Sequence, residues 1–218
     1  MFKSIEFERN LRLQSRANQG MGEIENFSKW LKDWPDKSLK KIGFETLELI
    51  TNFNYNHNIL NKKTYLAHVL RVTKMSILAQ PKLSKELIIL SMIHNIFEST
   101  DLNETDLLNY FDNKIIERVK ILKINREKQY LNSYLTIYYS SIQNAHISVS
   151  IVKIIDKIDN IFTLCLNPNL EKRKVYLKQI EDFVIPLTML KLPNIYKYLI
   201  KLVNNAHRTK HISIKSTS

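Results

Sequence analysis

Apolar residues recur at helical spacing along most of the chain. Two segments, residues 84–97 and 147–164, are apolar on nearly every side, which is typical of helices buried on all faces. Residues 64–78 carry a wide apolar face, and residues 22–33 and 37–53 follow the spacing of amphipathic helices. The pattern predicts several helices packed around two or three central ones.

Local breaking and capping signals set the ends of these helices. Pro35 ends the first amphipathic helix, and Asp36 is placed to cap the next one. Asn103 and Asp106 have the spacing of a capping box. Further helices are expected over residues 104–111, 113–122, 128–143 and 170–191, and from Pro193 to about residue 205.

Glycine and proline usage decides the fold class. The chain has only three glycines and five prolines, too few for the many tight turns of a strand-rich fold. We therefore expect an all-α protein with a single domain of about eight to ten helices. That domain should span residues 22–205, after an arm or short helix at residues 1–21 and before a polar tail at residues 206–218.

Cysteine content and the lack of long apolar runs indicate the compartment. Cys165 is the one cysteine and cannot form an internal disulfide, which fits a reducing compartment. The chain opens without the apolar core of a signal peptide. No run approaches the ~18 apolar residues of a membrane span. We expect a cytoplasmic protein with no membrane partner.

The net charge of +12 favours anionic partners. The lysines are scattered, and aromatic and basic residues do not alternate in the way that stacks bases. A solvated, lysine-rich surface therefore explains the charge better than a nucleic-acid face. An anionic nucleotide remains a fitting partner, and oligomerisation is open.

Polar residues interrupt the three most apolar segments. His68 lies in the first, His94 and Glu98 lie four apart in the second, and Asp156 and Asn160 lie four apart in the third. Residues four apart share a helix face. Burying such groups is costly unless they pair or bind a metal, and imidazole and carboxylate are ligands for Zn, Mn or Fe. We expect the groups to converge on one internal metal site.

Each residue taken alone also has an ordinary explanation. A single buried histidine such as His68 is more often hydrogen-bonded within the core, and Asp156 has Lys153 and Lys157 close by in sequence to pair with. The joint placement on three apolar helices favours the metal site.

The order of these segments resembles one family. Residues 94–100 read HNIFEST, similar to HD-x-x-E-D-T, and residues 111–119 read FDNKIIERV, similar to F-G-x-x-[IV]-x-x-x-V. Residues 153–164 read KIIDKIDNIFTL, similar to K-[IL]-A-D-R-L-x-N-x-x-T-L. The pair Pro186-Leu187 matches the end of the family's closing helix. Residues 60–190 thus resemble the RelA/SpoT-like alarmone hydrolases of the HD superfamily.

The resemblance implies an all-helical HD fold with a Mn²⁺-dependent site that removes pyrophosphate from the 3′ position of guanosine tetra- or pentaphosphate. By position, His68, His94 and Asp156 would be metal ligands, and Asn95 would occupy the fourth ligand position. Glu98 would help activate the attacking water.

The resemblance also places the nucleotide. Asn160 and Thr163 would approach it. The family's Arg-Lys element before the first histidine is absent, so Lys62 and Lys63 would stand in as point charges rather than as bidentate forks.

Two further departures concern hydrolysis. Asn95 replaces an aspartate and so leaves a dication less neutralised. Ser99 replaces the second acid, which removes a proton-handling group from the catalytic set.

These departures favour a degenerate HD protein that binds a guanosine polyphosphate with weak or absent hydrolysis. The alternatives are an active metal-dependent phosphohydrolase and a helical interaction protein with a vestigial pocket.

Overall fold

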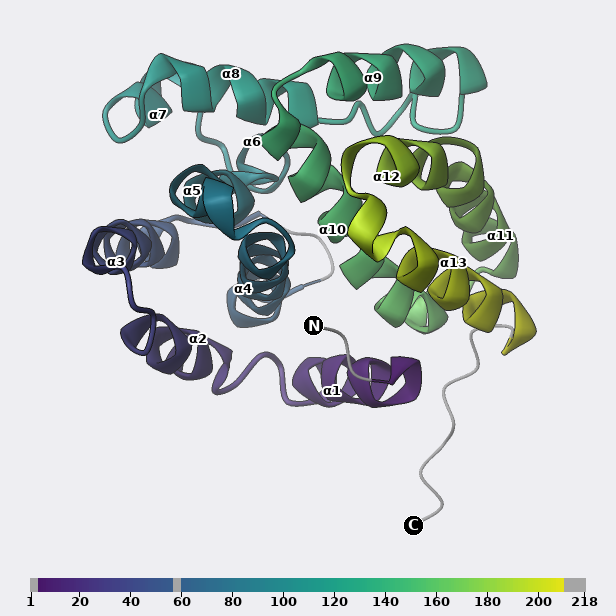
Figure 1. Ribbon diagram of the computed structural model, residues 1–218, viewed down its shortest axis with the longest axis horizontal. Coiled ribbons are helices and arrows are strands. Elements are labelled where there is room, and N and C mark those ends of the chain that lie inside the picture. Colours follow the sequence, from purple (N-terminus) through teal and green to yellow (C-terminus); the bar gives the residue numbers. More distant parts are fainter. Residues whose placement is uncertain (1–3, 57–59, 210–218) are drawn as a thin grey trace.

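The computed structural model describes residues 4–56 and 60–209, and every regular element in those ranges is helical (Figure 1). The α-helices are α1 Ile5–Ala17, α2 Glu23–Lys32, α3 Lys37–Asn52, α4 Lys62–Ala79, α5 Ser84–Ile93, α6 Ile96–Ser99, α7 Glu104–Leu108, α8 Asn113–Leu122, α9 Asn132–Asn144, α10 Ile147–Thr163, α11 Leu170–Gln179, α12 Ile185–Lys191 and α13 Pro193–Arg208. The all-α prediction is confirmed. None of the helices in the described ranges is long and apolar enough to cross a bilayer.

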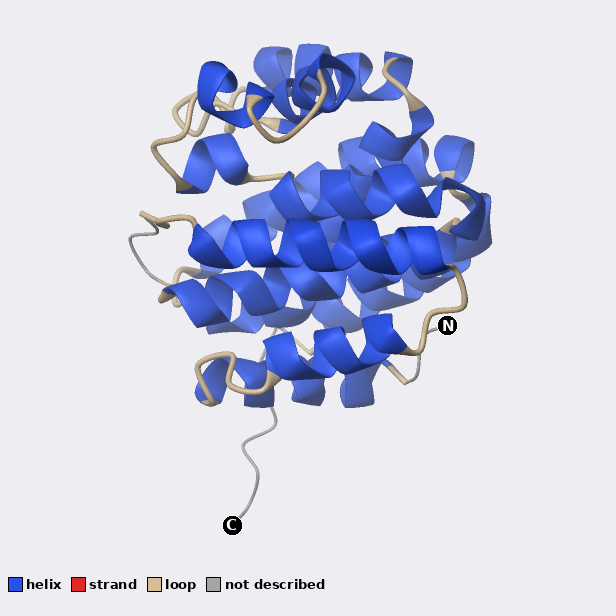
Figure 2. Cartoon of the chain, turned by 90° about the vertical axis from the view of Figure 1, so that its left-hand side faces the viewer, coloured by secondary structure: helices blue, strands red, loops and turns tan. Residues whose placement is uncertain are grey.

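Helix α10 runs through the centre of the molecule, with α4 and α5 on one side and α12 and α13 on the other (Figure 1). It is central because almost all of its residues are buried, including those between its aliphatic positions. Figure 2 shows the helices stacked in layers around this centre. The two most apolar segments of the sequence therefore form the core, as the hydrophobic pattern predicts.

The predicted single helix over residues 84–97 is wrong in one respect. Helix α5 ends at Ile93, and Asn95 has φ −112° and ψ 18° before the one-turn helix α6. Asparagine competes with the helical backbone for hydrogen bonds, which favours such a break. His94 and Glu98 are therefore not one turn apart on a continuous helix.

Two other predicted helices differ from those observed. The helix predicted from residue 128 begins at Asn132, because Asn125 instead caps a turn by accepting from the backbone N–H groups of Glu127 and Lys128. The helix predicted over residues 170–191 contains a π-helical turn, Ile180–Val184, just before Pro186. Proline cannot donate a helical hydrogen bond, and a wider turn accommodates that loss.

The N-terminal segment is predicted to be an arm or a short helix, and the structure shows a helix. Helix α1 is capped by Ser4 and packs against α4 and α10. The turn after it lies against the start of α4, because Gly20 has φ +72° and a Cβ there would be 2.5 Å from the Lys63 carbonyl oxygen. The tail predicted from residue 206 begins later, because α13 continues to Arg208 with Ala206 buried, and the residues beyond 209 fall outside the described ranges.

Candidate metal centre and its pocket

Three potential ligands meet beside the middle of α10. His68 comes from α4, His94 from the break after α5, and Asp156 from α10, and one donor atom of each lies within 4.8 Å of the others. His68 Nε2 is 3.3 Å and His94 Nε2 is 3.8 Å from Asp156 Oδ1. The convergence expected from the sequence is present, and the donor set suits a divalent transition metal.

The orientation of His94 fits a ligand role. Its ring is 1% exposed, and its Nδ1 lies 2.6 Å from the Ser91 carbonyl oxygen, so Nδ1 carries the proton and Nε2 keeps its lone pair. That Nε2 atom is buried without a hydrogen-bond partner among the described residues. A buried nitrogen of this kind is costly unless it binds something, and a cation between His94, His68 and Asp156 would satisfy it.

A second carboxylate orients His68. Asp159 Oδ2 lies 2.8 Å from His68 Nδ1, which directs Nε2 toward Asp156. Asp159 is itself held by Arg12, whose Nε donates over 2.6 Å, and by Arg71. Hydrogen bonds from carboxylates to ligand histidines fix the ring and raise its basicity. Asp159 has no predicted role, although its place three residues after Asp156 on an apolar helix signals a polar partner.

The electrostatics keep both aspartates ionised. Burial would raise the pKa of Asp156, but the nearby imidazoles of His68 and His94 and the charge of Lys153 hold it well below its usual value. The pKa of Asp159 is likewise held well below its usual value, because Arg71 and Arg12 outweigh its burial. Burial would lower the pKa of His68, but its bonds to the two carboxylates raise it to about 9.

A pocket opens beside the candidate metal centre, and the residues after His94 lie along it. Asn95 is half-buried and lines it. Glu98 accepts from the Ile124 N–H at 3.3 Å and from Arg126 Nε at 3.4 Å, both long contacts. Ser99 donates 2.7 Å to the Asn95 carbonyl, a hydrogen bond within its own helical turn. Glu98 thus faces the pocket under weak restraint, and Ser99 is engaged by the backbone.

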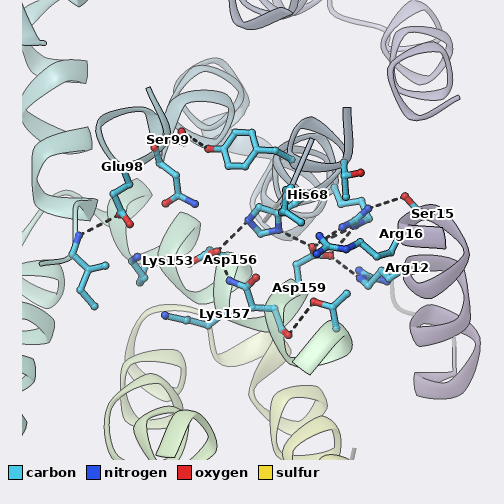
Figure 3. Close-up of a pocket in the computed structure, with 18 of the residues that line it drawn as sticks. Arg12, Ser15, Arg16, His68, Glu98, Ser99, Lys153, Asp156, Lys157 and Asp159 are labelled. Carbon is cyan, nitrogen blue, oxygen red and sulfur yellow. Dashed lines mark hydrogen bonds and ion pairs between the residues drawn. The ribbon is translucent and has the colours of Figure 1, made fainter. Parts of the chain in front are cut away.

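The pocket encloses about 300 Å³ and opens over His68 and Asp156 (Figure 3). Among the described residues three carboxylates line it, and they are outnumbered by six cationic side chains: Arg12, Arg16, Arg71, Arg126, Lys153 and Lys157. Burial and the nearby charge of Lys153 lower the pKa of Lys157 to about 8. The excess of cations suits a multiply charged anion.

The predicted nucleotide-contacting residues divide into two groups. Asn160 and Thr163 line the pocket, and Asn160 Nδ2 donates to Asp156 Oδ1 over 2.7 Å. Lys62 and Lys63 are not among the residues that line this pocket in the described part of the chain. Lys62 lies over the Tyr55 ring, with its Nζ 5.9 Å from the ring centroid, and Lys63 is exposed.

Helix α1 supplies pocket residues that the sequence analysis did not identify. Arg12, Ser15 and Arg16 all line the pocket and lie far from the ligands in sequence. The only signal available was their spacing of three and four along one helix face, within a segment too polar to show a clear apolar stripe.

Comparison with known proteins finds a similar curated protein and similar solved structures. The chain is 30% identical over 167 residues to a probable guanosine-3′,5′-bis(diphosphate) 3′-pyrophosphohydrolase of Mycoplasma genitalium, a match that covers 67% of this chain and 22% of the relative. The chain thus spans about a fifth of the length of that relative. No protein-family model matches the chain.

One of the similar solved structures is described as a metazoan ortholog of SpoT that hydrolyzes ppGpp, and it superposes with a TM-score of 0.60 at 14% identity, over 79% of this chain and 97% of the other. At this identity the likeness shows a shared all-helical fold.

Proposed function

From its relationship to the SpoT-like ppGpp pyrophosphohydrolases with the HD fold, we propose that this chain binds a guanosine polyphosphate in the cationic pocket and hydrolyses it weakly or not at all. A divalent cation, with Mn²⁺ as the first candidate, would be held by His68, His94 and Asp156. The observation that carries the proposal is the His94 Nε2 atom, which is buried without a partner among the described residues and beside two other donor atoms.

The pocket supplies the chemistry that binds phosphate. When bound, the cation would neutralise negative charge on a phosphoryl group. The basic side chains around it add attraction for the remaining phosphates. Asn160 and Thr163 offer amide and hydroxyl groups at one wall of the pocket, where a nucleotide would contact them.

The weakness of hydrolysis follows from two residues. Asn95 offers a neutral amide oxygen where a carboxylate would complete the ligand set, so a bound dication keeps more of its charge and is held less tightly. Ser99 brings no acid and is engaged with the Asn95 carbonyl. Glu98 is then the one remaining candidate in the predicted catalytic pair for accepting a proton from water.

Calorimetry with Mn²⁺, followed by guanosine tetraphosphate, tests binding, and an assay for pyrophosphate release tests turnover. We expect both ligands to bind at one per chain, with little or no pyrophosphate released. Failure of the wild-type protein to bind the nucleotide in the presence of Mn²⁺ would refute the proposal.

An active metal-dependent phosphohydrolase is the second candidate. The observation that favours it is Glu98, which lines the pocket and accepts two long hydrogen bonds. Sustained pyrophosphate release that disappears in Glu98→Gln would establish this alternative. A helical interaction protein with a vestigial pocket would instead keep all of its partner binding in the double variant His68→Ala/Asp156→Ala.

A further inference from the structure

Three arginines approach the metal centre from the side of α1 and α4. Arg12 forms ion pairs with Asp159 and Glu8. Arg71 forms ion pairs with Asp159 and Glu23 and donates a hydrogen bond to Ser15. Arg16 differs, because it makes no side-chain hydrogen bond or ion pair with any described residue, yet it lines the pocket. Figure 3 shows it extending from α1 toward the side of the pocket that holds His68 and Asp159.

The surroundings of Arg16 are unfavourable for a lone cation. Burial and the neighbouring charge of Arg71 both lower its pKa, which means that two guanidinium groups are close together on a partly dehydrated wall. The nearby carboxylates are already paired: Asp159 is shared by Arg12, Arg71 and His68, and Glu23 pairs with Arg71. An anion from outside would relieve the repulsion.

The wall is also fixed in place. Gly20 brings the turn after α1 against the Lys63 backbone, and Asn61 Nδ2 donates 3.1 Å to Gln19 Oε1. Ser15 Oγ accepts from Arg71 Nη1 at 3.3 Å, which leaves its hydroxyl hydrogen available to a ligand. Arg16 and Ser15 are therefore held one helix turn from Arg12, beside the centre.

We propose that Arg16, with the Ser15 hydroxyl, forms a second phosphate subsite, which binds the phosphate group of the nucleotide that is not at the metal centre. This proposal rests on the proposed function and specifies its ligand as a nucleotide with two separate phosphate groups. Planar guanidinium groups bind phosphate oxygens through paired N–H donors. The subsite lies on α1, whereas the sequence placed the phosphate-binding charges at Lys62 and Lys63.

The test compares two ligands by calorimetry with Mn²⁺ present: guanosine 3′,5′-bis(diphosphate), with two groups, and guanosine 3′-diphosphate, which keeps the group expected at the metal centre and lacks the 5′ group. The wild-type protein should prefer the first. Arg16→Gln should weaken its binding by about 10-fold to 100-fold, the range for losing a hydrogen bond to a charged group, and leave the second ligand within about 2-fold. Ser15→Ala should lower the same preference by a smaller factor.

Lys29→Gln is the matched control, because it removes one charge from an exposed position on α2 outside the pocket. It should leave the preference unchanged, and thermal unfolding should show that both variants are folded. The subsite is overturned if Arg16→Gln leaves the preference unchanged or weakens the binding of both ligands equally. It is also overturned if the preference is lost in Lys63→Gln and kept in Arg16→Gln. Each of these results would leave the proposed function standing. A wild-type protein that binds neither ligand would overturn both.

Discussion

The side chain of Asn95 sets the charge of the candidate metal centre. Asp156 is the single carboxylate among the described donors of this cluster. Mutating a residue that contacts a metal ligand, without binding the metal itself, changes metal affinity by about 10-fold to 100-fold. A residue in a ligand position should have at least this effect. Asn95→Asp should therefore strengthen Mn²⁺ binding by at least about 10-fold, measured by calorimetry.

Asn113→Asp is the control for that change, since it adds the same charge at the exposed first turn of α8. It should leave Mn²⁺ binding unchanged. Equal affinities in the wild-type protein and Asn95→Asp would mean that residue 95 does not face the metal.

Asp159 has both a structural and a positioning role. Asp159→Asn removes a buried negative charge that Arg12 and Arg71 share, and breaking a buried pair costs about 3 to 5 kcal/mol. Because Glu8 still pairs with Arg12, we expect a loss near 3 kcal/mol in the free energy of unfolding. Mn²⁺ affinity should also fall by about 10-fold, since His68 loses its orienting carboxylate.

Chemical denaturation and metal titration separate these two roles. Asp33→Asn, at an exposed site, controls for the loss of charge. Lower stability with unchanged Mn²⁺ affinity would show that Asp159 only supports the fold.

At the residue scale, the sequence located His68, His94 and Asp156 because polar groups stand out in apolar helices. The same contrast is lacking in α1, where Arg12 and Arg16 lie among other polar residues. Their approach to the pocket depends on how α1 packs against α4 and α10, and sequence spacing does not encode that packing.

At the scale of elements, the turn between α1 and α2 determines how α1 meets the pocket. Both of its glycines have positive φ, +72° at Gly20 and +78° at Gly22, but only Gly20 lies against backbone atoms. A side chain in this conformation costs about 1 to 2 kcal/mol. Gly22→Ala should therefore lower the free energy of unfolding by about that amount.

Gly20→Ala adds a steric clash with the Lys63 backbone to the same conformational strain. It should cost at least about 1 kcal/mol more than Gly22→Ala, within the range for overpacking, and it should weaken nucleotide binding. Denaturation of the two variants in parallel measures the difference. Equal losses would show that the turn can shift away from α4 at no cost.

Helix boundaries show where sequence patterns stop being informative. Capping by Asp36 and the Asn103–Asp106 box were predictable because they are local. The break at His94–Asn95 was not, since the apolar run continues through it and the helix ends in the segment that contributes His94 to the centre. The π-helical turn before Pro186 is also set by packing, although the proline marks its position.

Across the whole molecule, the net charge of +12 and the cationic pocket both attract anionic ligands. Binding of guanosine tetraphosphate should weaken several-fold as NaCl rises from about 0.05 M to 0.5 M, because salt screens the exposed charges. Mn²⁺ binding at the buried ligands should change less. Calorimetry at several salt concentrations checks both, and nucleotide binding that is insensitive to salt would argue against an electrostatic pocket.

The contribution of α1 bears on how fragments of this protein are chosen for expression. Periodicity alone suggests a boundary at Glu23, where the first clear amphipathic helix begins. A polypeptide started there would keep the histidines and Asp156 but would remove Arg12 from the buried carboxylate of Asp159. Such a shortened product would lose one of the two guanidinium groups that hold Asp159 in place, and a failed binding assay with it would describe the truncation rather than the protein.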